Sequence, residues 1–570
     1  MNADRLLEHY ERIADAPDAV GRLRRFVLDL AVRGKLVPQD PADEPASELL
    51  KRIAKEKARL VKAGEIKVLK PLTPVSWDDL SIVPPSGWIA SRLADLTVCL
   101  DYMREPVNGT ERDKRIEGKA VEDLYPYFGA TQQQGWIDEY LFDEELVLLG
   151  EDGVPFFDRL RTKAYLISGK TWVNNHAHVF RSIFISNQFV VHYLNAFDYS
   201  GRVVGATRAK LNQAQAVDIP VPLPPLTEQH RIVAKVDELM ALCDRLEAAR
   251  AEREATRDRL AAASLARLNA PDPEAFTDDA RFALNALPAL TTRPDQIKQL
   301  RQTILNLAVR GKLVPQDPAD EPALELLKRI TMERAGPQAV RKARRNGEAD
   351  VSSLRADTSL ANDWRWTNIE EVALSMRYGT STKCEYTTPG VPVLRIPNVS
   401  GGVVSLDDIK FGPLTEAENR DLALNAGDIL MIRSNGSLDI VGRAAVVPPT
   451  AAGMAFAGYL VRLRLSLSNI KPEYVWLALN STDVRDQIER PIRSAVGLKN
   501  VNLTEFGALT FPLPPLAEQH RIVAKVNALM ALCDQLEASL TTGDATRRRL
   551  LDALLAEALA PAATDERQAA

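Results

Sequence analysis

Two stretches of the chain place apolar residues at the spacing of a long amphipathic helix. The apolar positions from Val236 to Leu246, and again from Val526 to Leu536, fall at a and d positions of a heptad. Each pattern predicts a helix of roughly 40 residues, about 60 Å long at 1.5 Å per residue. A PLPPL sequence precedes each helix and predicts an extended lead-in, because proline is not tolerated in a helix interior. Few heptads have apolar residues at both the a and the d position, so we expect the two helices to pack antiparallel rather than to form a free coiled coil.

Short apolar runs outside these stretches predict strands. They lie at residues 145–150, 164–168 and 189–194, and at residues 391–399, 428–433 and 459–465. Two further helical patterns end at Gly34 and Gly311, and each is followed by a shorter one, at residues 46–57 and 323–334. Segments 270–294 and 336–359 are rich in proline, charge and small residues and predict linkers.

Two segments of the chain recur almost unchanged. Residues 23–53 (LRRFVLDLAVRGKLVPQDPADEPASELLKRI) recur at 300–330, and residues 222–248 (PLPPLTEQHRIVAKVDELMALCDRLEA) recur at 512–538. Each half therefore has a shared opening, a private middle and a shared closing, since residues 75–220 and 358–511 share little sequence. Identical surfaces imply the same partner bound twice. Different middles imply two ligands, or two parts of one asymmetric ligand.

Composition narrows the class of protein without naming it. Of the 570 residues, 45% are hydrophobic and 26% are charged, as in an ordinary globular protein, and no apolar run reaches the length of a membrane span. Four cysteines are too few for a disulfide framework, and the N-terminus has no apolar signal core, so we expect a cytoplasmic protein. The net charge of −5 argues against a chain coated by nucleic acid but leaves room for a local basic cleft.

A PLPPLxEQHRIVAKV motif that follows a strand-rich variable region, present twice, resembles the specificity subunits of type I restriction-modification enzymes. Motifs inside the middles are also similar to the target-recognition domains of that family; they lie at residues 129–140, 148–153 and 169–180, and at residues 390–402, 427–437 and 496–516. The resemblance implies a complex with double-stranded DNA, two modification (methyltransferase) subunits and, for cutting, restriction subunits. The modification subunits of the family carry S-adenosylmethionine and flip the target adenine. One departure is that the shared opening precedes each variable region.

We predict an α+β fold with an internal pseudo-two-fold repeat, in which two long antiparallel helices separate two strand-rich target-recognition domains. The helices would set the spacing of the half-sites and dock the methyltransferase subunits. The predicted parts are a helical segment (1–74), the first recognition domain (75–220), the first shared helix (221–269), a linker with the second helical segment (270–357), the second recognition domain (358–511), and the second shared helix with a tail (512–570).

The sequence offers little chemistry of its own. An amino-methyltransferase needs an Asn/Asp-Pro-Pro-aromatic motif, which residues 83–86 and 447–450 do not match, and the P-loop fragment at Lys170 has Ala164 in place of the first glycine. His176 and His178 alternate on a predicted strand without a second cluster of ligands. Cys243 and Cys533 fall on the heptad seam and predict core positions. We therefore predict no catalytic residue, no metal and no cofactor.

DNA contacts are expected from Arg, Lys, Asn and Gln in the private middles, because these side chains pair with base edges and phosphates. In the first middle the candidates are Gln132, Gln133, Gln134, Arg161, Lys163, Lys170, Asn174, Asn175, Arg208 and Lys210. In the second they are Arg377, Lys383, Arg395, Asn398, Arg433, Asn435, Lys499 and Asn500. Each could instead be a solvated surface residue or a turn former.

Two alternatives belong to other classes of protein. The chain could be a self-contained DNA methyltransferase or nuclease, which methyl transfer by the purified chain alone would favour. It could also be a coiled-coil scaffold whose arms bind carbohydrate or protein, which absence of sequence-specific DNA binding with the modification subunit would favour.

Overall fold

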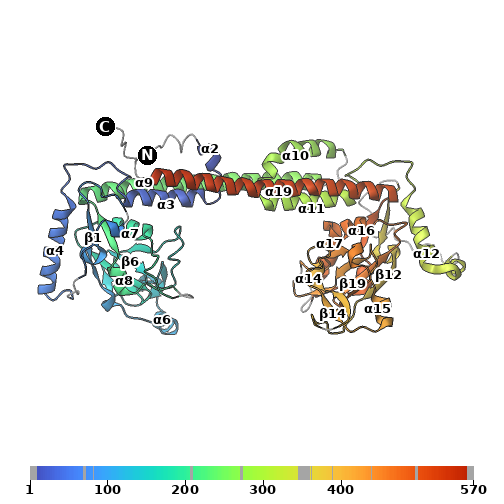
Figure 1. Ribbon diagram of the computed structural model, residues 1–570, viewed down its shortest axis with the longest axis horizontal. Coiled ribbons are helices and arrows are strands. Elements are labelled where there is room, and N and C mark those ends of the chain that lie inside the picture. The colour runs from blue at the N-terminus through green and yellow to red at the C-terminus, as the bar shows by residue number, and fades with distance from the viewer. Residues whose placement is uncertain are drawn as a thin grey trace, which may run out of the picture. The chain divides into compact units, whose positions relative to one another are not determined.

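The computed structural model describes residues 9–67, 72–80, 82–205, 209–269, 274–343, 360, 363–387, 389–437, 439–493 and 499–560. They fall into two compact units, Met1–Arg253 with Gly543–Ala570, and Glu254–Thr542. Each unit contains one domain of mixed helices and strands together with parts of the two longest helices (Figure 1). The predicted class of mixed α and β structure is therefore confirmed.

The first domain is built on two four-stranded sheets. One has the order β2-β9-β6-β7, from Thr97–Cys99, Ala177–Ser182, Leu146–Gly150 and Ala164–Ile167, with every pair antiparallel. The other has the order β4-β3-β8-β5, from Gln133–Ile137, Tyr125–Phe128, Lys170–Val173 and Phe142–Asp143, with β3 and β8 parallel. Helices α6 (Gly109–Ile116), α7 (Asn187–Ala196) and α8 (Gln213–Val217) complete it. All five residues of β6 are buried, which places the core behind this strand.

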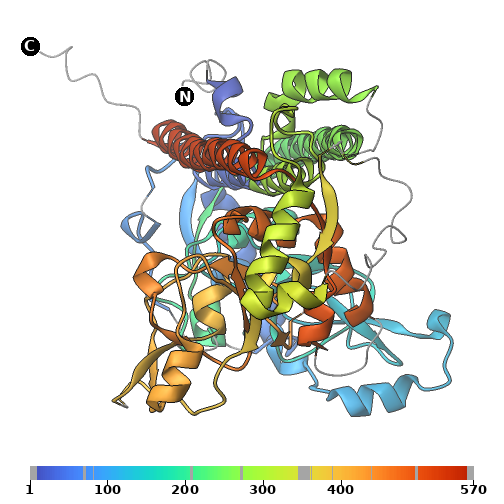
Figure 2. The ribbon, with the colours of Figure 1, turned by 90° about the vertical axis from the view of Figure 1, so that its right-hand side faces the viewer.

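The second domain repeats this plan. Its main sheet has the order β12-β19-β15-β17, from Ala373–Tyr378, Leu460–Leu465, Ile429–Ile432 and Ala444–Val446. Its second sheet, β14-β13-β18, comes from Lys410–Gly412, Val391–Leu394 and Ala455–Phe456, and β13 and β18 are parallel as β3 and β8 are. A short ribbon pairs β16 (Ser434–Asn435) with β20 (Lys499–Asn500). Helix α12 (Ala323–Ala343) runs along one side of this domain (Figure 2).

Two helices, α9 (Leu226–Leu268) and α19 (Leu516–Leu559), have 43 and 44 residues and confirm the predicted length. Cys243 and Cys533 are buried, as the heptad pattern predicts. In unit 1, α3 (Ala19–Val32) packs against the start of α9 and the end of α19. In unit 2, α11 (Pro294–Val309) packs in the same way against the start of α19 and the end of α9.

Equivalent ion pairs fix these helices within each unit. The Arg24 guanidinium contacts Asp244 at 2.5 Å and Glu247 at 2.8 Å. In unit 2, Arg301 contacts Asp534 at 2.7 Å and Glu537 at 3.0 Å. The repeated opening and closing sequences therefore encode the same helix contacts twice.

The EQ dipeptide at the start of α9 joins that helix to the first domain. Glu228 accepts a hydrogen bond from Trp88 Nε1 at 3.0 Å, and Gln229 accepts one from the Ser186 backbone N–H at 3.0 Å. Burial raises the pKa of the Glu228 carboxyl, while the hydrogen bond from Trp88 opposes that change. The next residue but one, Arg231, contacts Asp43 at 2.5 Å, so the irregular loop before α4 (Ala46–Lys62) is tied to the same point.

The second copy uses the same bonds at the start of α19. Glu518 accepts from Trp364 Nε1 at 2.9 Å, Gln519 accepts from the Lys471 backbone N–H at 2.9 Å, and Arg521 contacts Asp320 at 2.7 Å. The PLPPL lead-ins are extended as predicted, and each also pairs with another strand. β10 (Pro220–Leu223) pairs with β1 (Ile89–Arg92), and β21 (Thr510–Leu513) pairs with β11 (Arg365–Asn368). Much of the repeated motif thus serves to attach a domain to its helix.

Four predictions of local structure were wrong, and one of them is the linker predicted at 336–359, because α12 continues to Ala343. Residues 189–194, predicted as a strand, belong to α7, which begins after the N-cap Ser186. The run 391–399 is a strand only to Leu394, because the Asn398 side chain accepts a hydrogen bond from the Arg395 backbone N–H and turns the chain into helix α14 (Ile396–Val399). The predicted linker 270–294 contains helix α10 (Phe276–Leu290), which packs Ala283 against the end of α9. None of the helices in the described ranges is both long and apolar enough to cross a membrane.

Candidate nucleic-acid interface

Three backbone hydrogen bonds in each domain, equivalent between the two, show that the domains share one framework at the ends of their central strands. Glu151 N–H donates to His176 C=O at 2.8 Å, and Arg433 N–H donates to Tyr459 C=O at 3.0 Å. Leu211 N–H donates to Glu151 C=O at 2.8 Å, and Val501 N–H donates to Arg433 C=O at 2.8 Å. Asn174 N–H donates to Phe128 C=O at 3.0 Å, and Ala457 N–H donates to Leu394 C=O at 2.9 Å.

These bonds align the residues of one domain with those of the other. We call the aligned residues the strand-end surface. In the first domain it comprises Glu151, Asp152, Asn174, Asn175, His176 and Lys210. In the second domain it comprises Arg433, Ser434, Ala457, Gly458, Tyr459 and Asn500. Every aligned pair differs in residue type, so one framework presents two different sets of side chains.

In the second domain the strand-end surface opens into a groove of about 970 Å³. Four cationic residues line it, namely Lys383, Arg395, Lys410 and Arg433. The rings of Tyr378 and Tyr459 also line it, and Tyr459 is 64% exposed. A groove lined by cations suits nucleic acid, because phosphates need positive charge.

The cations of this groove differ in how freely they can act. The Arg395 guanidinium donates to Asp408 Oδ2 at 2.7 Å and to the backbone carbonyl of Asp408 at 2.9 Å. This guanidinium therefore mainly holds the loop at Asp408. Lys383 is 87% exposed and, among the residues that the structure describes, pairs with Glu385 at 2.7 Å. Lys410 Nζ lies 4.8 Å from the centre of the exposed Tyr386 ring. Lys383 and Lys410 can therefore reach phosphates at small structural cost.

In the first domain the equivalent position holds a network of charged residues. The buried His178 places Nδ1 2.6 Å from Asp101 Oδ2 and Nε2 2.8 Å from the Leu211 carbonyl. Glu151 contacts Arg104 at 2.9 Å and Lys210 at 3.0 Å. Burial by itself would raise the pKa of Asp101, but the hydrogen bond from His178 and the charges of His178 and Arg104 hold it below its usual value.

Asp101, Glu151 and His178 have the spacing of a metal site, but their ligand atoms are already used. Both nitrogens of His178 face oxygen acceptors, and Arg104 contacts both carboxylates. A divalent ion here would have to displace a guanidinium and break a histidine hydrogen bond. The cluster is better explained as an internal support that also holds the half-exposed Lys210 side chain.

The structure places most first-domain candidates at the surface. Gln132, Gln133, Gln134, Arg161, Lys170, Asn175 and Lys210 are exposed. Lys163 is only 1% exposed, and its ammonium donates to the carbonyls of Asp158 at 2.6 Å and Arg161 at 2.7 Å, so its prediction as a DNA contact was wrong. Burial is the main cause that lowers the pKa of Lys163 to about 8. Asn174 is buried and accepts from the His176 backbone N–H at 2.8 Å, and Arg208 lies outside the described residues.

In the second domain the groove brings together four candidates, Lys383, Arg395, Arg433 and Asn500. Arg377 is exposed but contacts Asp421 at 2.8 Å, and Asn435 accepts from the Ser437 backbone N–H at 2.8 Å. Asn398 is 2% exposed and donates to two loop carbonyls, so it is a structural residue and its prediction as a contact was wrong. The backbone of Lys499 pairs with Asn435, and its side chain lies outside what the structure describes.

Sequence reasoning missed Tyr378, Lys410, Tyr459 and His176. The two tyrosines fall next to glycines in strand-like runs, where a ring that packs in the core is the ordinary expectation. His176 was weighed only as a metal ligand, yet it is aligned with Tyr459 and is partly exposed beside Asp152. The alignment of the two frameworks marks His176 and Tyr459, and the lining of the groove marks Tyr378 and Lys410.

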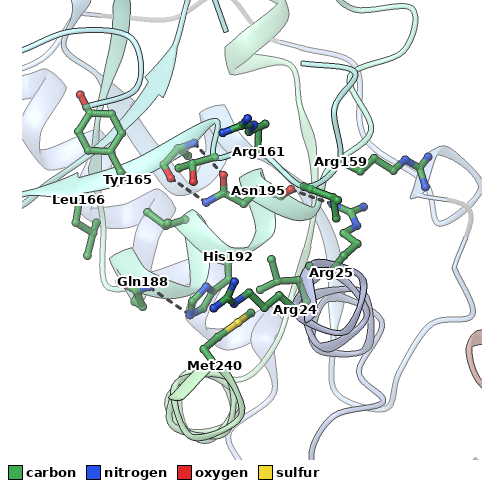
Figure 3. Close-up of a pocket in the computed structure, with 16 residues that line it drawn as sticks. Arg24, Arg25, Arg159, Arg161, Tyr165, Leu166, Gln188, His192, Asn195 and Met240 are labelled. Atoms are coloured by element: carbon green, nitrogen blue, oxygen red, sulfur yellow. Dashed lines mark hydrogen bonds between the residues drawn. The ribbon is translucent and has the colours of Figure 1, made fainter. Parts of the chain in front are cut away.

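Unit 1 also has an arginine-lined cavity of about 410 Å³ between α3, α7 and α9 (Figure 3). Three of its four arginines contact acids closely: Arg25 contacts Asp29 at 3.0 Å, Arg159 contacts Asp198 at 2.8 Å, and Arg24 is bound to α9 as described above. Arg25 also donates to the Asn195 carbonyl at 2.9 Å. The cavity is therefore a joint between the domain and its helices.

Comparison with known proteins decides the family. The family model described as the type I restriction modification DNA specificity domain matches residues 106–254 and again residues 362–542. The chain belongs to this family of type I restriction-modification specificity proteins. The EcoEI specificity subunit of Escherichia coli is 30% identical over 95% of this chain and 94% of that subunit. The EcoAI specificity subunit of Escherichia coli is 30% identical over 94% of this chain and 93% of that subunit.

A crystal structure of the HsdS subunit from Thermoanaerobacter tengcongensis aligns with 17% identity over 84% of this chain and 98% of that chain, with a TM-score of 0.39. Each of the two matched regions of this specificity subunit contains one strand-end surface. Family membership assigns DNA sequence recognition to the chain as a whole. The alternatives of a self-contained enzyme and of a scaffold for other ligands are not favoured.

Proposed function

We propose that each domain reads one half of a two-part site in double-stranded DNA through its strand-end surface. One observation carries this proposal: a shared backbone framework holds Arg433 in one domain and Glu151 in the other. Arg433 contacts Asn500 at 3.2 Å, and Glu151 contacts Lys210, the residue aligned with Asn500, at 3.0 Å. Equal frameworks with different side chains at every aligned position suit two different half-sites and do not suit two copies of the same one.

Within each half-site, we assign two tasks to different residues. Exposed lysines, such as Lys383 and Lys410, would neutralise phosphates and set the register on the duplex. Asn, Gln and Arg on the surface, such as Asn175 and Arg433, would read base edges in the major groove. The chain carries a net charge of −5, so attraction to DNA would be confined to these cationic patches.

The modification subunits would dock on the exposed sides of α9 and α19. Leu242 is 43% exposed on α9, and Leu532, the same position of the second copy, is 54% exposed on α19. His230 on α9 and His520 at the same position of α19 are also exposed. The same exposed side chains recur on both helices, which supports one kind of partner bound twice. Helix α9 is continuous from unit 1 into unit 2, so its length would set the spacing of the half-sites.

In this proposal the chain performs no reaction. The modification subunits would supply S-adenosylmethionine and the pocket for the flipped adenine, and restriction subunits would join for cutting. The specificity subunit would contribute only the position of the reaction on DNA. Support comes from the named relatives, which are specificity subunits of type I restriction enzymes.

A double substitution in the groove tests the proposal. Lys383→Ala with Lys410→Ala removes two candidate phosphate contacts, so the chain with its modification subunits should bind its DNA site roughly tenfold more weakly, with a salt slope lower by about two. Titration of a labelled duplex at several salt concentrations measures both quantities. The matched control is Lys328→Ala, which removes an exposed lysine whose ion pair with Glu325, at 2.7 Å, has the length of the Lys383–Glu385 pair. Unchanged affinity and slope in the double variant would refute the assignment of the groove to DNA.

A further inference from the structure

The Arg433 side chain is held on three sides at the edge of the groove. Its guanidinium carbon lies 4.3 Å from the centre of the Tyr378 ring. Its Nε donates to Asn500 Oδ1 at 3.2 Å, and its Nη1 approaches the Gly458 carbonyl at 3.4 Å. Tyr378 is itself fixed, because its hydroxyl accepts a hydrogen bond from the Leu503 backbone N–H at 2.9 Å. Arg433 is therefore oriented before any ligand arrives.

The holding bonds leave one edge of the guanidinium available. Nη2 of Arg433 has no hydrogen-bond partner among the residues that the structure describes, and the side chain lines the open groove. Arg433 also makes no ion pair with a carboxylate in the described part of the chain. A guanidinium with a free edge and no neutralising acid is set up to meet an acceptor from outside.

We propose that Arg433 reads a guanine in the half-site of the second domain, with Tyr378 and Asn500 as positioning residues. This inference rests on the proposed function. Guanine presents two acceptors, N7 and O6, in the major groove, and a planar guanidinium matches that pair better than any other side chain. The Tyr378 ring and the Asn500 amide keep the plane of the guanidinium fixed, which reduces the entropy lost when it binds.

The other arginines of the groove region are less suited to this task. Nη2 of Arg395 already donates to the backbone carbonyl and to the side-chain Oδ2 of Asp408. Arg377 contacts Asp421 at 2.8 Å. Lys383 and Lys410 are flexible point charges, which suit phosphates and not the fixed geometry of a base edge. Arg433 alone among these five cations combines a fixed plane with an acid-free environment.

The first domain carries a different group at the same position. Glu151 is only 12% exposed, and its carboxylate is paired with Arg104 and with the half-exposed Lys210. The first domain therefore has no arginine at the position of Arg433. A guanine contact at the Arg433 position is therefore expected in one half-site only.

The test uses the chain assembled with its modification subunits and the DNA motif that this complex methylates in cells. In the half-site assigned to the second domain, each guanine is replaced in turn by 7-deazaguanine, which pairs normally but lacks the N7 acceptor. For one guanine, the replacement should weaken binding by the unmodified complex about tenfold. The same replacement should have no further effect on the Arg433→Lys complex, which should already bind about tenfold more weakly.

Two further variants separate reading from folding. Asn500→Ala leaves Arg433 in place but frees its Nε, so it should weaken discrimination at the same guanine with an unchanged melting temperature. Arg377→Lys changes an exposed arginine of the same domain and should leave the response to 7-deazaguanine unchanged. The inference is overturned if no guanine shows coupling to Arg433, or if Arg433→Lys binds as tightly as the unmodified complex, as a lysine that keeps a phosphate contact would. In those cases the proposed function stands as long as the Lys383 and Lys410 variant loses affinity, and both fail if it does not.

Discussion

At the residue scale, the first informative feature is a glutamate carboxyl group that is buried at the same position in both copies of the repeated motif. Glu228 and Glu518 are each 1% exposed, and each has one oxygen bonded to a tryptophan and the other without a hydrogen bond to any described residue. Burial raises the pKa of Glu518 against the opposing effects of Trp364 and Arg521. The folded state therefore favours the protonated form more than the unfolded state does.

The sign of the resulting pH dependence follows from that direction. Because the folded pKa of Glu518 is raised, its contribution to stability is full below the unfolded pKa and is lost as pH rises through the folded pKa. Glu518→Gln removes this titration while its amide oxygen can still accept from Trp364. The melting temperature of the variant relative to the unmodified chain should therefore increase from pH 4.5 to pH 8. Equal differences at the two pH values, or the same trend in the exposed control Glu325→Gln, would contradict this explanation.

Residue types predicted the site correctly only where the sequence also indicated that the side chain is exposed. Arg433 was found because it follows an apolar strand, and Asn500 because its amide can pair with a base edge; the groove brings them together. Lys163 and Asn398 have equally suitable chemistry, yet their polar atoms are consumed by loop carbonyls. Composition does not distinguish a side chain that faces DNA from one that closes a turn, since both need the same donors. Tertiary hydrogen bonds make that difference.

At the element scale, periodicity predicted the long helices well. An amphipathic pattern repeated over several turns has few competing interpretations, and α9 and α19 have 43 and 44 residues as a result. A short run such as residues 189–194 is ambiguous, because β-branched residues that are buried on all sides suit a strand or a helix equally. The deciding feature was the N-cap at Ser186, whose hydroxyl accepts from the Phe189 backbone N–H at 3.3 Å.

The exposed leucines of these helices give a prediction about assembly. Leu242→Glu and Leu532→Glu place a charge on each candidate docking side while keeping a residue that favours helix, so the fold should tolerate them. Mass photometry should then detect two modification subunits on the unmodified chain, one on either single variant and none on the double variant. The control pair is Ala248→Glu with Ala538→Glu, exposed positions about 120° away around each helix at 3.6 residues per turn. Two bound subunits on the double leucine variant would show that docking lies elsewhere.

At the scale of the whole molecule, the internal repeat was the most productive observation. Matching openings and closings around different middles indicated one partner bound twice and two ligand-binding parts, and family membership confirms the DNA-recognition role. The repeat could not give the boundaries at which a domain ends and its helix begins. Those are set by pairs such as Trp88 with Glu228, in which one partner lies in the private middle and the other in the shared closing.

The central claim is that the two domains are independent readers within one specificity subunit. Its most direct measurement is single-molecule sequencing of genomic DNA from cells that lack other methylation and express the chain with its modification subunit. Replacement of residues 358–511 by the corresponding domain of a relative should change one half of the methylated motif and leave the other half as it was. Replacement of residues 75–220 should do the reverse. A motif that changes in both halves, or in neither, after either replacement would contradict the account.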